Sequence, residues 1–486
     1  MEKTIVLAAG KENISTSCDG CPGCSRRAAG TLRQTNENGR TALSGSAAHE
    51  QATMRCEERM ESAATPHDTA AANHGSQACT FPADIEFVVG QAADWGIERV
   101  VTVRKAFDEA ILALFDTLAR RILTSASAHQ FPDVVAFAQW CRKASLENLR
   151  CEMGTGAVML GRGIGFHVSP SNIPMMAAYN LALGLISGNC TIVRLPFRIF
   201  PQMAYLCSEI TACLSEERHS ALSRVMALIR YDRTRVDITQ YLSTRCDVRV
   251  IWGGDATVDE IRRIPLRPHA HELTFPDRYS VLVIDAAAWL AADDKARLMH
   301  GFYNDTFLND QASCASPRMV LWLGRHAREA RDDFWPRLEA LVRERYRPVH
   351  AGTVAKLTYA YEKLARHPGL RMVSSDPLVM RIVSDSPLPE LLEGHPGGGI
   401  FIECDIADLS AMAPVLARRC QTVVYFGVPA QELLAVICGA GAPGGDRIVP
   451  IGQTLDFSAI WDGHDIVRAL SRTLTVGARQ EGRQLA

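Results

Sequence analysis

Residues 161–196 read GRGIGFHVSPSNIPMMAAYNLALGLISGNCTIVRLP. A short apolar run that ends at Val168 predicts a strand, and residues 174–187 predict an apolar helix that a proline opens and Gly188-Asn189 ends. Cys190-Thr-Ile-Val193 then predicts a buried strand. A strand, a helix and a second strand in this order are typical of a parallel sheet that helices cover.

The same alternation extends in both directions along the chain. Before the quoted stretch, residues 104–125 and 133–150 carry apolar positions at helical spacing. After it, the pattern predicts helices over residues 201–216, 219–229 and 257–263, and strands over residues 247–252 and 279–284. A second αβ region is expected beyond residue 285, with strands over residues 318–323, 400–403 and 421–426 and helices over residues 292–302, 325–344, 351–366, 408–418 and 429–438. The predicted fold class is therefore α/β with two parallel sheets.

The composition is that of a globular protein. The chain has 486 residues, 47% apolar and 22% charged, and its net charge of −2 gives no basic field for nucleic acid. Charged residues interrupt every apolar stretch before the roughly 18 residues that a membrane span needs. The first residues lack the apolar core of a signal peptide, so we expect a cytoplasmic protein whose fifteen cysteines are free thiols.

Residues 1–80 differ from the rest of the chain. They are polar and show little apolar periodicity, which predicts a disordered extension. Cys18, Cys21 and Cys24 have a spacing that can ligate zinc or an iron–sulfur cluster, but a fourth ligand would have to come from a distant residue such as Cys56. A flexible tail is the alternative, and we predict no metal site.

The first candidate for chemistry is the stretch Asn309-Asp-Gln-Ala-Ser-Cys-Ala-Ser-Pro317. Cys314 stands among small residues, between a predicted helix and a predicted strand, so a substrate carbonyl can approach its sulfur and backbone N–H groups can face an oxyanion. A thiolate suits acyl transfer because it is nucleophilic near neutral pH and leaves readily. Taken by itself, one cysteine among fifteen is also compatible with a buried structural thiol.

Three further candidates stand at the ends of predicted strands. The loop Ser169-Pro-Ser-Asn-Ile-Pro174 holds Asn172 rigidly, where its amide can donate to an oxyanion or cap the following helix. Arg194 can pair with a phosphate at the edge where open α/β sheets bind ligands, or it can be a solvated surface residue. In Trp252-Gly-Gly-Asp-Ala-Thr257 the glycines let a ligand approach the backbone, although an ordinary tight turn also explains them and the GxGxxG fingerprint is absent.

In this order, the stretches resemble the aldehyde-dehydrogenase superfamily and, more narrowly, the LuxC-type acyl-CoA or acyl-protein thioester reductases. The resemblance rests on Asp310-Gln-Ala-Ser-Cys-Ala-Ser-Pro317 and on two C-terminal stretches, Asp446-Arg-Ile-Val-Pro-Ile-Gly-Gln-Thr-Leu-Asp-Phe457 and Ile460-Trp-Asp-Gly463. Gln421-Thr-Val423 also fits. The resemblance covers residues 85–475.

This resemblance implies an aldehyde-dehydrogenase-like fold with two α/β domains. Residues 81–285 are expected to form a Rossmann-like dinucleotide-binding domain, and residues 286–445 a catalytic domain. Residues 446–486 are expected to form an arm that packs back on the core and takes part in homo-oligomerisation.

The resemblance also implies roles for individual residues. Cys314 would be the nucleophile that accepts the acyl group, and Asn172 would donate to the oxyanion. Glu272-Leu273 stands where the superfamily has Glu-Leu-Gly-Gly, so Glu272 is a candidate base. Because Thr274-Phe275 replaces the two glycines, a structural role for Glu272 is equally compatible.

The expected cofactor is NADPH. The resemblance implies that it contacts Ser169, Pro170, Arg194, Gly253, Gly254 and Thr257. Phe197 stands where many NAD-preferring relatives carry an acid, so no carboxylate at that position repels a 2′-phosphate.

The expected reaction is the reduction of a fatty acyl thioester to the aldehyde through an acyl-Cys314 intermediate. The donor would be acyl-CoA or an acyl group on a protein, in which case an acyl-protein synthetase is the expected partner. Two alternatives are an oxidising aldehyde dehydrogenase that uses Glu272 as base, and a non-catalytic subunit of an acyl-protein synthetase.

Overall fold

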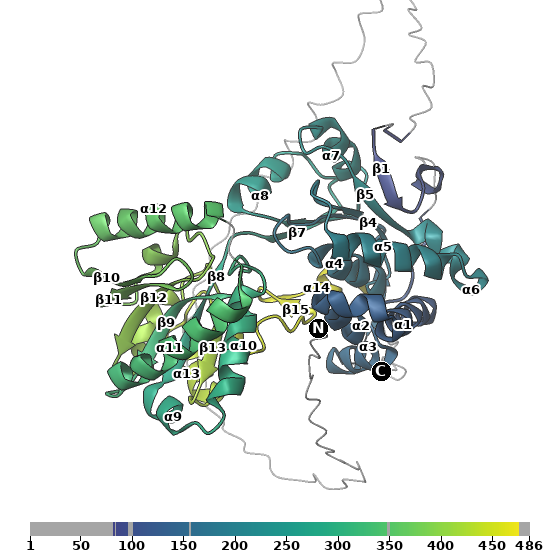
Figure 1. Ribbon diagram of the computed structural model, residues 1–486. Coiled ribbons are helices and arrows are strands. Elements are labelled where there is room, and N and C mark those ends of the chain that lie inside the picture. Colours follow the sequence, from purple (N-terminus) through teal and green to yellow (C-terminus); the bar gives the residue numbers. More distant parts are fainter. Residues whose placement is uncertain (1–80, 83, 96–100, 155–156, 348–349, 476–486) are drawn as a thin grey trace, which may run out of the picture. The chain divides into compact units, whose positions relative to one another are not determined.

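The computed structural model describes residues 81–82, 84–95, 101–154, 157–347 and 350–475. The predicted disorder of residues 1–80 and the cysteine cluster within them lie outside these residues. The described residues form one compact unit, whose strands build two mainly parallel sheets with helices packed against them (Figure 1). The prediction of an α/β fold with two such sheets is confirmed. No helix among the described residues is long and apolar enough to cross a membrane.

The first sheet contains six strands. Their order is β1 (Glu86–Val89), β5 (Met226–Arg230), β4 (Cys190–Arg194), β3 (Ile164–Val168), β6 (Val248–Trp252) and β7 (His271–Phe275). The edge strand β1 runs antiparallel, and the other five strands are parallel. The chain moves outward from β3 through β4 to β5 and then crosses back to β6. This reversal between β3 and β6 is the place where open α/β sheets bind ligands, at the carboxyl ends of their strands.

Helices pack on this sheet through their apolar faces. Helix α4 (Met176–Ile186) is apolar all round and almost completely buried, since it lies against both the sheet and other helices. Helix α1 (Glu109–Thr124) is amphipathic, and Asp108 caps its first turn by accepting a hydrogen bond of 3.1 Å from the N–H of Ala110. The remaining helices of this half are α2 (Pro132–Trp140), α3 (Lys143–Glu152), α5 (Pro201–Leu214), α6 (Glu217–Ser220), α7 (Val236–Ser243) and α8 (Asp255–Arg262).

The prediction of one helix over residues 219–229 is wrong. Helix α6 and a short 3-10 helix end at Val225, and Met226–Arg230 is strand β5 of the first sheet. The first four residues of this strand are buried. A short, fully apolar run has no periodicity that distinguishes a buried strand from a buried helix, which explains the error.

The second sheet contains seven strands. Their order is β10 (Leu370–Ser375), β11 (Met380–Ser384), β12 (Ile400–Ile406), β9 (Pro317–Leu323), β8 (Tyr279–Asp285), β13 (Cys420–Phe426) and β14 (Arg447–Pro450). Only the edge strand β10 is antiparallel. Strand β8 lies in this sheet, so the chain passes from the first sheet to the second at residues 276–278 and not at the predicted boundary of residue 285.

Apolar side chains cover both faces of the second sheet. One cluster contains Val281, Met319 and Ile402, and the other contains their strand neighbours Leu282, Val320 and Phe401. This burial on both faces is expected for parallel strands between helices. The helices of this half are α9 (Ala286–Ala291), α10 (Lys295–Phe307), α11 (Ala327–Arg345), α12 (His350–Arg366) and α13 (Ala430–Gly439).

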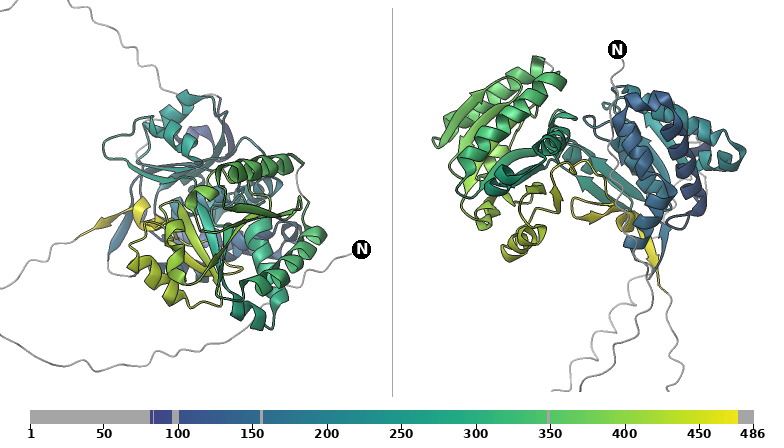
Figure 2. Two further views of the ribbon diagram at one scale, coloured as in Figure 1. Left: turned by 90° about the vertical axis from the view of Figure 1, so that its left-hand side faces the viewer. Right: turned by 60° about the horizontal axis from the view of Figure 1, so that its bottom comes forward.

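The C-terminal segment returns to the first half of the unit. After β14 it forms a hairpin of β15 (Ile460–Trp461) and β16 (His464–Asp465), the short helix α14 (Ile466–Leu470) and strand β17 (Ser471–Leu474). Strand β17 pairs with β2 (Val158–Gly161), and the yellow strand lies beside a blue one in Figure 2. The amide of Asn189 adds a hydrogen bond of 2.9 Å to the backbone oxygen of Leu470. The expected role of this segment in oligomerisation stays a prediction.

Candidate active site

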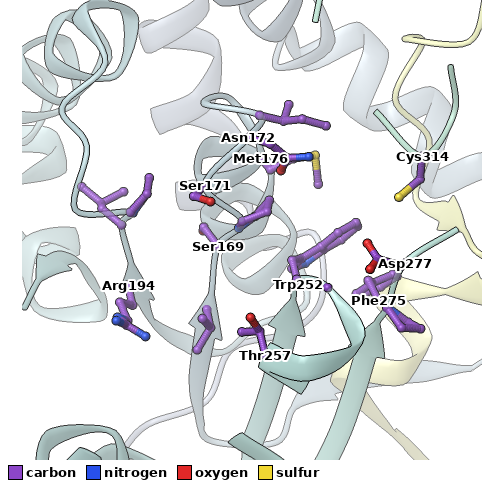
Figure 3. Close-up of a pocket in the computed structure, with 18 of the residues that line it drawn as sticks. Ser169, Ser171, Asn172, Met176, Arg194, Trp252, Thr257, Phe275, Asp277 and Cys314 are labelled. Atoms are coloured by element: carbon purple, nitrogen blue, oxygen red, sulfur yellow. The ribbon is translucent and has the colours of Figure 1, made fainter. Parts of the chain in front are cut away.

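A cavity of about 630 Å³ lies where the carboxyl ends of β3, β4 and β6 meet the residues that precede β9 and begin β13 (Figure 3). It brings together eight of the nine residues predicted for the site: Ser169, Pro170, Asn172, Arg194, Gly253, Gly254, Thr257 and Cys314. Its volume is within the range of small-molecule sites in proteins, which is about 300–1,000 Å³.

The loop that carries Cys314 has a tightly fixed backbone. Asp310 and Gln311 both have positive φ, 52° and 54°, a conformation that side chains other than glycine rarely adopt. The phenolic hydroxyl of Tyr346 donates a hydrogen bond of 2.9 Å to Oδ1 of Asp310. Gly397 lies so close that a Cβ there would be 2.6 Å from the backbone oxygen of Asp310. This turn is therefore held from both sides.

Gln311 connects this loop to the start of β12. Its side chain is completely buried. Nε2 donates to the backbone oxygens of Pro317 (2.8 Å) and Ile400 (3.0 Å), and Oε1 accepts from the N–H groups of Gly399 (3.0 Å) and Ile400 (3.2 Å). Four backbone groups are thus satisfied by one side chain, which fixes the loop against the second sheet.

Cys314 is a partly buried free thiol whose side chain faces the cavity (Figure 3). Its backbone oxygen accepts a hydrogen bond of 2.7 Å from Oγ of Ser280 at the start of β8. Its own N–H donates to no acceptor in the described part of the chain, so it can serve an oxyanion. The loop therefore presents the sulfur to the cavity and leaves one backbone N–H without an acceptor among the described residues.

Several groups act on the protonation of the Cys314 thiol. Burial raises its pKa, while the guanidinium of Arg318 and the backbone N–H of Arg278 act in the opposite direction. The carboxylates of Asp462 and Asp277 raise the pKa further. The net effect keeps the resting group protonated at neutral pH, so the attack of its sulfur requires a group that takes the proton.

Asn172 bridges to the cysteine loop. Its Nδ2 donates a hydrogen bond of 3.0 Å to the backbone oxygen of Ala312, two residues before Cys314. An amide nitrogen carries two hydrogens, so the second remains available for an oxyanion. Asn172 and Cys314 thus line the same cavity, and the role of Asn172 as an oxyanion donor stays a prediction.

The opposite side of the cavity is rich in guanidinium groups, of which that of Arg194 is labelled in Figure 3. Arg194 lies over the ring of Tyr231, with 4.5 Å between its Cζ atom and the ring centroid. Arg194, Arg198 and Arg233 line the cavity, and none of them forms an ion pair within the described residues. Asp232 is the carboxylate on this side, and hydrogen bonds from Thr234 hold its pKa below its ordinary value. An excess of positive charge at strand ends fits the phosphates of a dinucleotide.

The wall between the two sides is apolar and closely packed. The rings of Trp252 and Phe275 stack at 3.7 Å between centroids, and Nε1 of Trp252 donates a hydrogen bond of 2.7 Å to Asn180. Gly253 follows directly, and a Cβ there would be 3.1 Å from Cβ of Thr257. The glycine keeps this approach to the backbone open, which also fits a bound dinucleotide.

Glu272 is the predicted site residue that the structure does not bring to the cavity. Its carboxylate pairs with Arg249 (2.7 Å to Nε) and Arg262 (3.0 Å to Nε). It stands three residues before the end of β7, which corresponds to about 10 Å of strand. The hypothesis that Glu272 is a catalytic base is therefore replaced by a structural role, in which it forms ion pairs between neighbouring elements.

The cavity is also lined by residues for which no role was predicted from the sequence. Asp277 lies in the linker between the sheets, Gln421 is the second residue of β13, and Trp461 and Asp462 belong to the C-terminal hairpin. Among the described residues no group of three His, Cys, Asp or Glu side chains could hold a metal ion. Gln421 and the hairpin lie within the stretches that carry the family resemblance, which was the available signal.

Residues 142–344 match the family acyl-CoA reductase (LuxC). No curated protein sequence gives a significant match.

Solved structures of aldehyde dehydrogenases have a similar fold. Aldehyde dehydrogenase 21 from Physcomitrella patens, in complex with the reaction product succinate, matches with a TM-score of 0.57 and 10% identity over 77% of this chain and 86% of that one. An NAD-dependent aldehyde dehydrogenase from Sinorhizobium meliloti matches with a TM-score of 0.56 and 11% identity over 76% and 84%. A salicylaldehyde dehydrogenase from Pseudomonas putida G7, complexed with salicylaldehyde, matches with a TM-score of 0.55 and 13% identity over 77% and 86%. The chain thus has an aldehyde-dehydrogenase-like fold, and its residues 142–344 match the LuxC acyl-CoA reductase family.

Proposed function

We propose that the protein reduces a fatty acyl thioester to the aldehyde, with Cys314 as the acyl carrier and NADPH as the reductant. One observation carries this proposal: the sulfur of Cys314 and the arginine-rich strand ends open onto the same cavity. An acyl group on the cysteine and a dinucleotide at the strand ends would therefore meet in one enclosed space. The match to acyl-CoA reductases supports the same direction of reaction.

The residues of the first sheet fit a dinucleotide with a 2′-phosphate. Arg194, Arg198 and Arg233 offer three guanidinium groups, and Asp232 is the single carboxylate among them. Phe197 contributes no charge of its own. When bound there, the nicotinamide supplies the hydride that the reduction needs. The preference for NADPH over NADH follows from this balance of charge.

In the first half of the reaction, Cys314 attacks the carbonyl carbon of the donor thioester. The amide of Asn172 and the N–H of Cys314 hold the oxyanion that forms. The donor thiol then leaves, and the acyl group remains on the sulfur. After reduction of this acyl group, the carbonyl re-forms as the C–S bond to Cys314 breaks, which releases the aldehyde.

The position of Glu272 argues against the alternative of an oxidising dehydrogenase. Such an enzyme activates water beside the acyl-cysteine, and the proposed base for this step was Glu272. Its carboxylate is held by Arg249 and Arg262 outside the cavity. A thioester that is protected from hydrolysis can persist until it is reduced.

The proposed donor is acyl-CoA, in accordance with the family that matches residues 142–344. An acyl group delivered by a protein, with an acyl-protein synthetase as partner, is the alternative donor. Both donors present the same thioester to Cys314, so the chemistry at the sulfur is common to them. We further propose a cytoplasmic homo-oligomer.

The test is the intact mass of the protein after incubation with octanoyl-CoA or palmitoyl-CoA. We expect a mass increase of one acyl group that maps to Cys314, and its loss with release of aldehyde when NADPH is added. Cys314→Ala should abolish the adduct. Cys438→Ala is the matched control, because Cys438 is exposed but lies outside the cavity, so its removal should leave the adduct in place. An acyl group found on Cys438 instead would contradict the assignment of Cys314.

A further inference from the structure

The hairpin Ile460-Trp-Asp-Gly463-His-Asp465 reaches the cavity with its turn. Trp461 pairs with His464, so Asp462 and Gly463 form a two-residue turn in which both φ angles are positive, 51° and 75°. This is the turn that Asp-Gly sequences favour between antiparallel strands. The consequence is that Asp462 of the turn lines the cavity that contains Cys314, next to Trp461 of β15.

The carboxylate of Asp462 is almost completely enclosed, with 5% of its side chain exposed. Its Oδ1 accepts a hydrogen bond of 2.6 Å from Nε2 of Gln421 and lies 3.5 Å from Nη1 of Arg278. Its Oδ2 accepts no hydrogen bond from any residue that the structure describes. One oxygen is thus fixed by neighbours, and the other is free to exchange a proton.

Asp462 and Cys314 are coupled through the same linker residue. The backbone N–H of Arg278 stabilises the Cys314 thiolate, while its guanidinium contacts Asp462. The charge of Asp462 also acts directly on the cysteine. Asp277 is the other carboxylate in the cavity near Cys314, but it is exposed to solvent. Of these two carboxylates, Asp462 is therefore the enclosed one, and it is the better candidate for a proton carrier.

We propose that Asp462 is the acid–base residue of the acylation step, an inference that rests on the proposed function. As Sγ of Cys314 bonds to the acyl carbon, the thiol proton passes to Oδ2 of Asp462. As the bond between that carbon and the donor sulfur breaks, Oδ2 returns the proton to the departing thiolate. The step consumes no proton and changes no oxidation state.

The other charged groups around Asp462 shape its behaviour. Burial raises its pKa, and Arg278 acts in the opposite direction. Asp446 raises the pKa and His464 lowers it. Arg447, whose guanidinium lies over the ring of Trp461, also faces this carboxylate. A carboxyl whose pKa lies above its ordinary value can both accept and return a proton.

The experiment compares two rates at pH 7 without NADPH: the acylation of Cys314 by octanoyl-CoA, and its alkylation by iodoacetamide. Alkylation needs only the thiolate, whereas acylation also needs a proton for the leaving sulfur. In Asp462→Asn we expect acylation to slow by about 10²–10⁴-fold. Alkylation should stay the same or become faster, because the loss of a negative charge favours the thiolate. Asparagine also tolerates the positive φ of this turn.

Asp446→Asn is the matched control. Asp446 pairs with Arg278 at 2.6 Å but does not line the cavity, so this variant breaks an ion pair of the same arginine. We expect it to change both rates by the same small factor. If Asp462→Asn also lowers both rates equally, its role is structural and the inference is overturned. Loss of acylation in Asp277→Asn, with Asp462→Asn unaffected, would overturn it as well.

A measurement on the wild-type protein does not depend on the folding of any variant. With a proton acceptor beside the sulfur, the acylation rate should remain high at pH values where alkylation has already declined. Coinciding pH profiles of the two rates would overturn the inference. If octanoyl-CoA acylates the wild type and Asp462→Asn at the same rate, the inference about Asp462 is refuted, whereas the proposed function stands. If neither acyl-CoA acylates wild-type Cys314, the proposed function fails with acyl-CoA as the donor, and the acylation step proposed for Asp462 fails with it.

Discussion

Asn172 donates a hydrogen bond of 3.0 Å from its side-chain amide to the backbone oxygen of Ala312, although 140 residues separate them in the sequence. The bond joins the loop after β3 in the first sheet to the loop before β9 in the second. It therefore links the proposed oxyanion donor to the loop of the proposed nucleophile. A single contact thus fixes the relative positions of two groups that must act on the same carbonyl.

Replacing Asn172 tests its role as oxyanion donor. Asn172→Ala should lower the rate of acylation by octanoyl-CoA by about 10²–10³-fold, because one donor to the developing negative charge is lost. Alkylation by iodoacetamide forms no oxyanion and should change by less than about threefold. Mass spectrometry of quenched samples measures both rates. Asn304→Ala, in an exposed position of α10, is the matched control. Equal acylation rates in the wild type and Asn172→Ala would remove Asn172 from the mechanism.

Gln311 should be a major determinant of stability in the catalytic half. Gln311→Leu removes four hydrogen bonds to backbone groups of Pro317, Gly399 and Ile400, although the oxygen of Ile400 keeps its contact of 3.1 Å with Nε2 of His395. Each buried unpaired group costs about 1–3 kcal/mol, so we expect the free energy of unfolding to fall by about 3–5 kcal/mol. Urea unfolding followed by fluorescence measures the change. Gln139→Leu, on an exposed face of α2, should change it by less than about 0.5 kcal/mol. Similar values for the two variants would show that the Gln311 bonds contribute little.

The sequence predicted much of the fold because the decisive signals are local. Runs of neighbouring residues predict the strands at Cys190–Arg194 and Val248–Trp252. They also predict the apolar helix α4, which precedes the first of these strands. Strand Met226–Arg230 was missed because a short apolar run is ambiguous. The strand Leu370–Ser375, at the edge of the second sheet, and its neighbour Met380–Ser384 were also missed. In the first of them Val373 is exposed and Ser374 is partly buried, so apolar and polar residues do not follow the alternation of burial.

The site could be predicted only where a residue stands at the end of an element. Cys314, Asn172 and Arg194 follow or precede strands, so the topology itself brings them to one cavity. Glu272 was misassigned because its position within β7 depends on the register with Arg249 of β6, which local sequence does not determine. Asp462 lines the cavity of Cys314 although 148 positions separate the two residues in the sequence. Its approach depends on the packing of the C-terminal hairpin against the linker between the sheets, and that packing is a property of the folded unit.

Arg194 provides a test of the cofactor preference. Arg194→Ala should weaken the binding of NADP⁺ by about 10–100-fold, because a hydrogen bond between charged groups contributes about 1.5–3 kcal/mol. The binding of NAD⁺, which lacks the 2′-phosphate, should change by less than about threefold. Isothermal titration calorimetry measures both dissociation constants on the same protein. A parallel loss for both cofactors would place Arg194 at a phosphate that they share and would contradict its role in the preference.

Asp305 joins α10 to the C-terminal segment, and its carboxylate should make the free energy of unfolding depend on pH. Its carboxylate, 1% exposed, accepts hydrogen bonds from the N–H of Gly452 (2.6 Å) and from the N–H (3.1 Å) and hydroxyl (2.8 Å) of Thr454. Burial raises its pKa from 3.8 to about 6. The folded protein therefore holds this proton more tightly than the unfolded chain does. The resulting stability is fully present below pH 3.8 and is lost as the pH rises through about 6.

The stability that Asp305 contributes should fall by about 2 kcal/mol between pH 4.5 and pH 7. Asp305→Asn cannot titrate, so it isolates this contribution from that of all other groups. The free energy of unfolding of the wild type minus that of Asp305→Asn should be about 2 kcal/mol larger at pH 4.5 than at pH 7, as measured by urea unfolding. The sign distinguishes two physical situations. A difference that grows with pH would mean that the three donors from Gly452 and Thr454 outweigh burial and stabilise the charged carboxylate, whereas the expected decrease means that burial dominates.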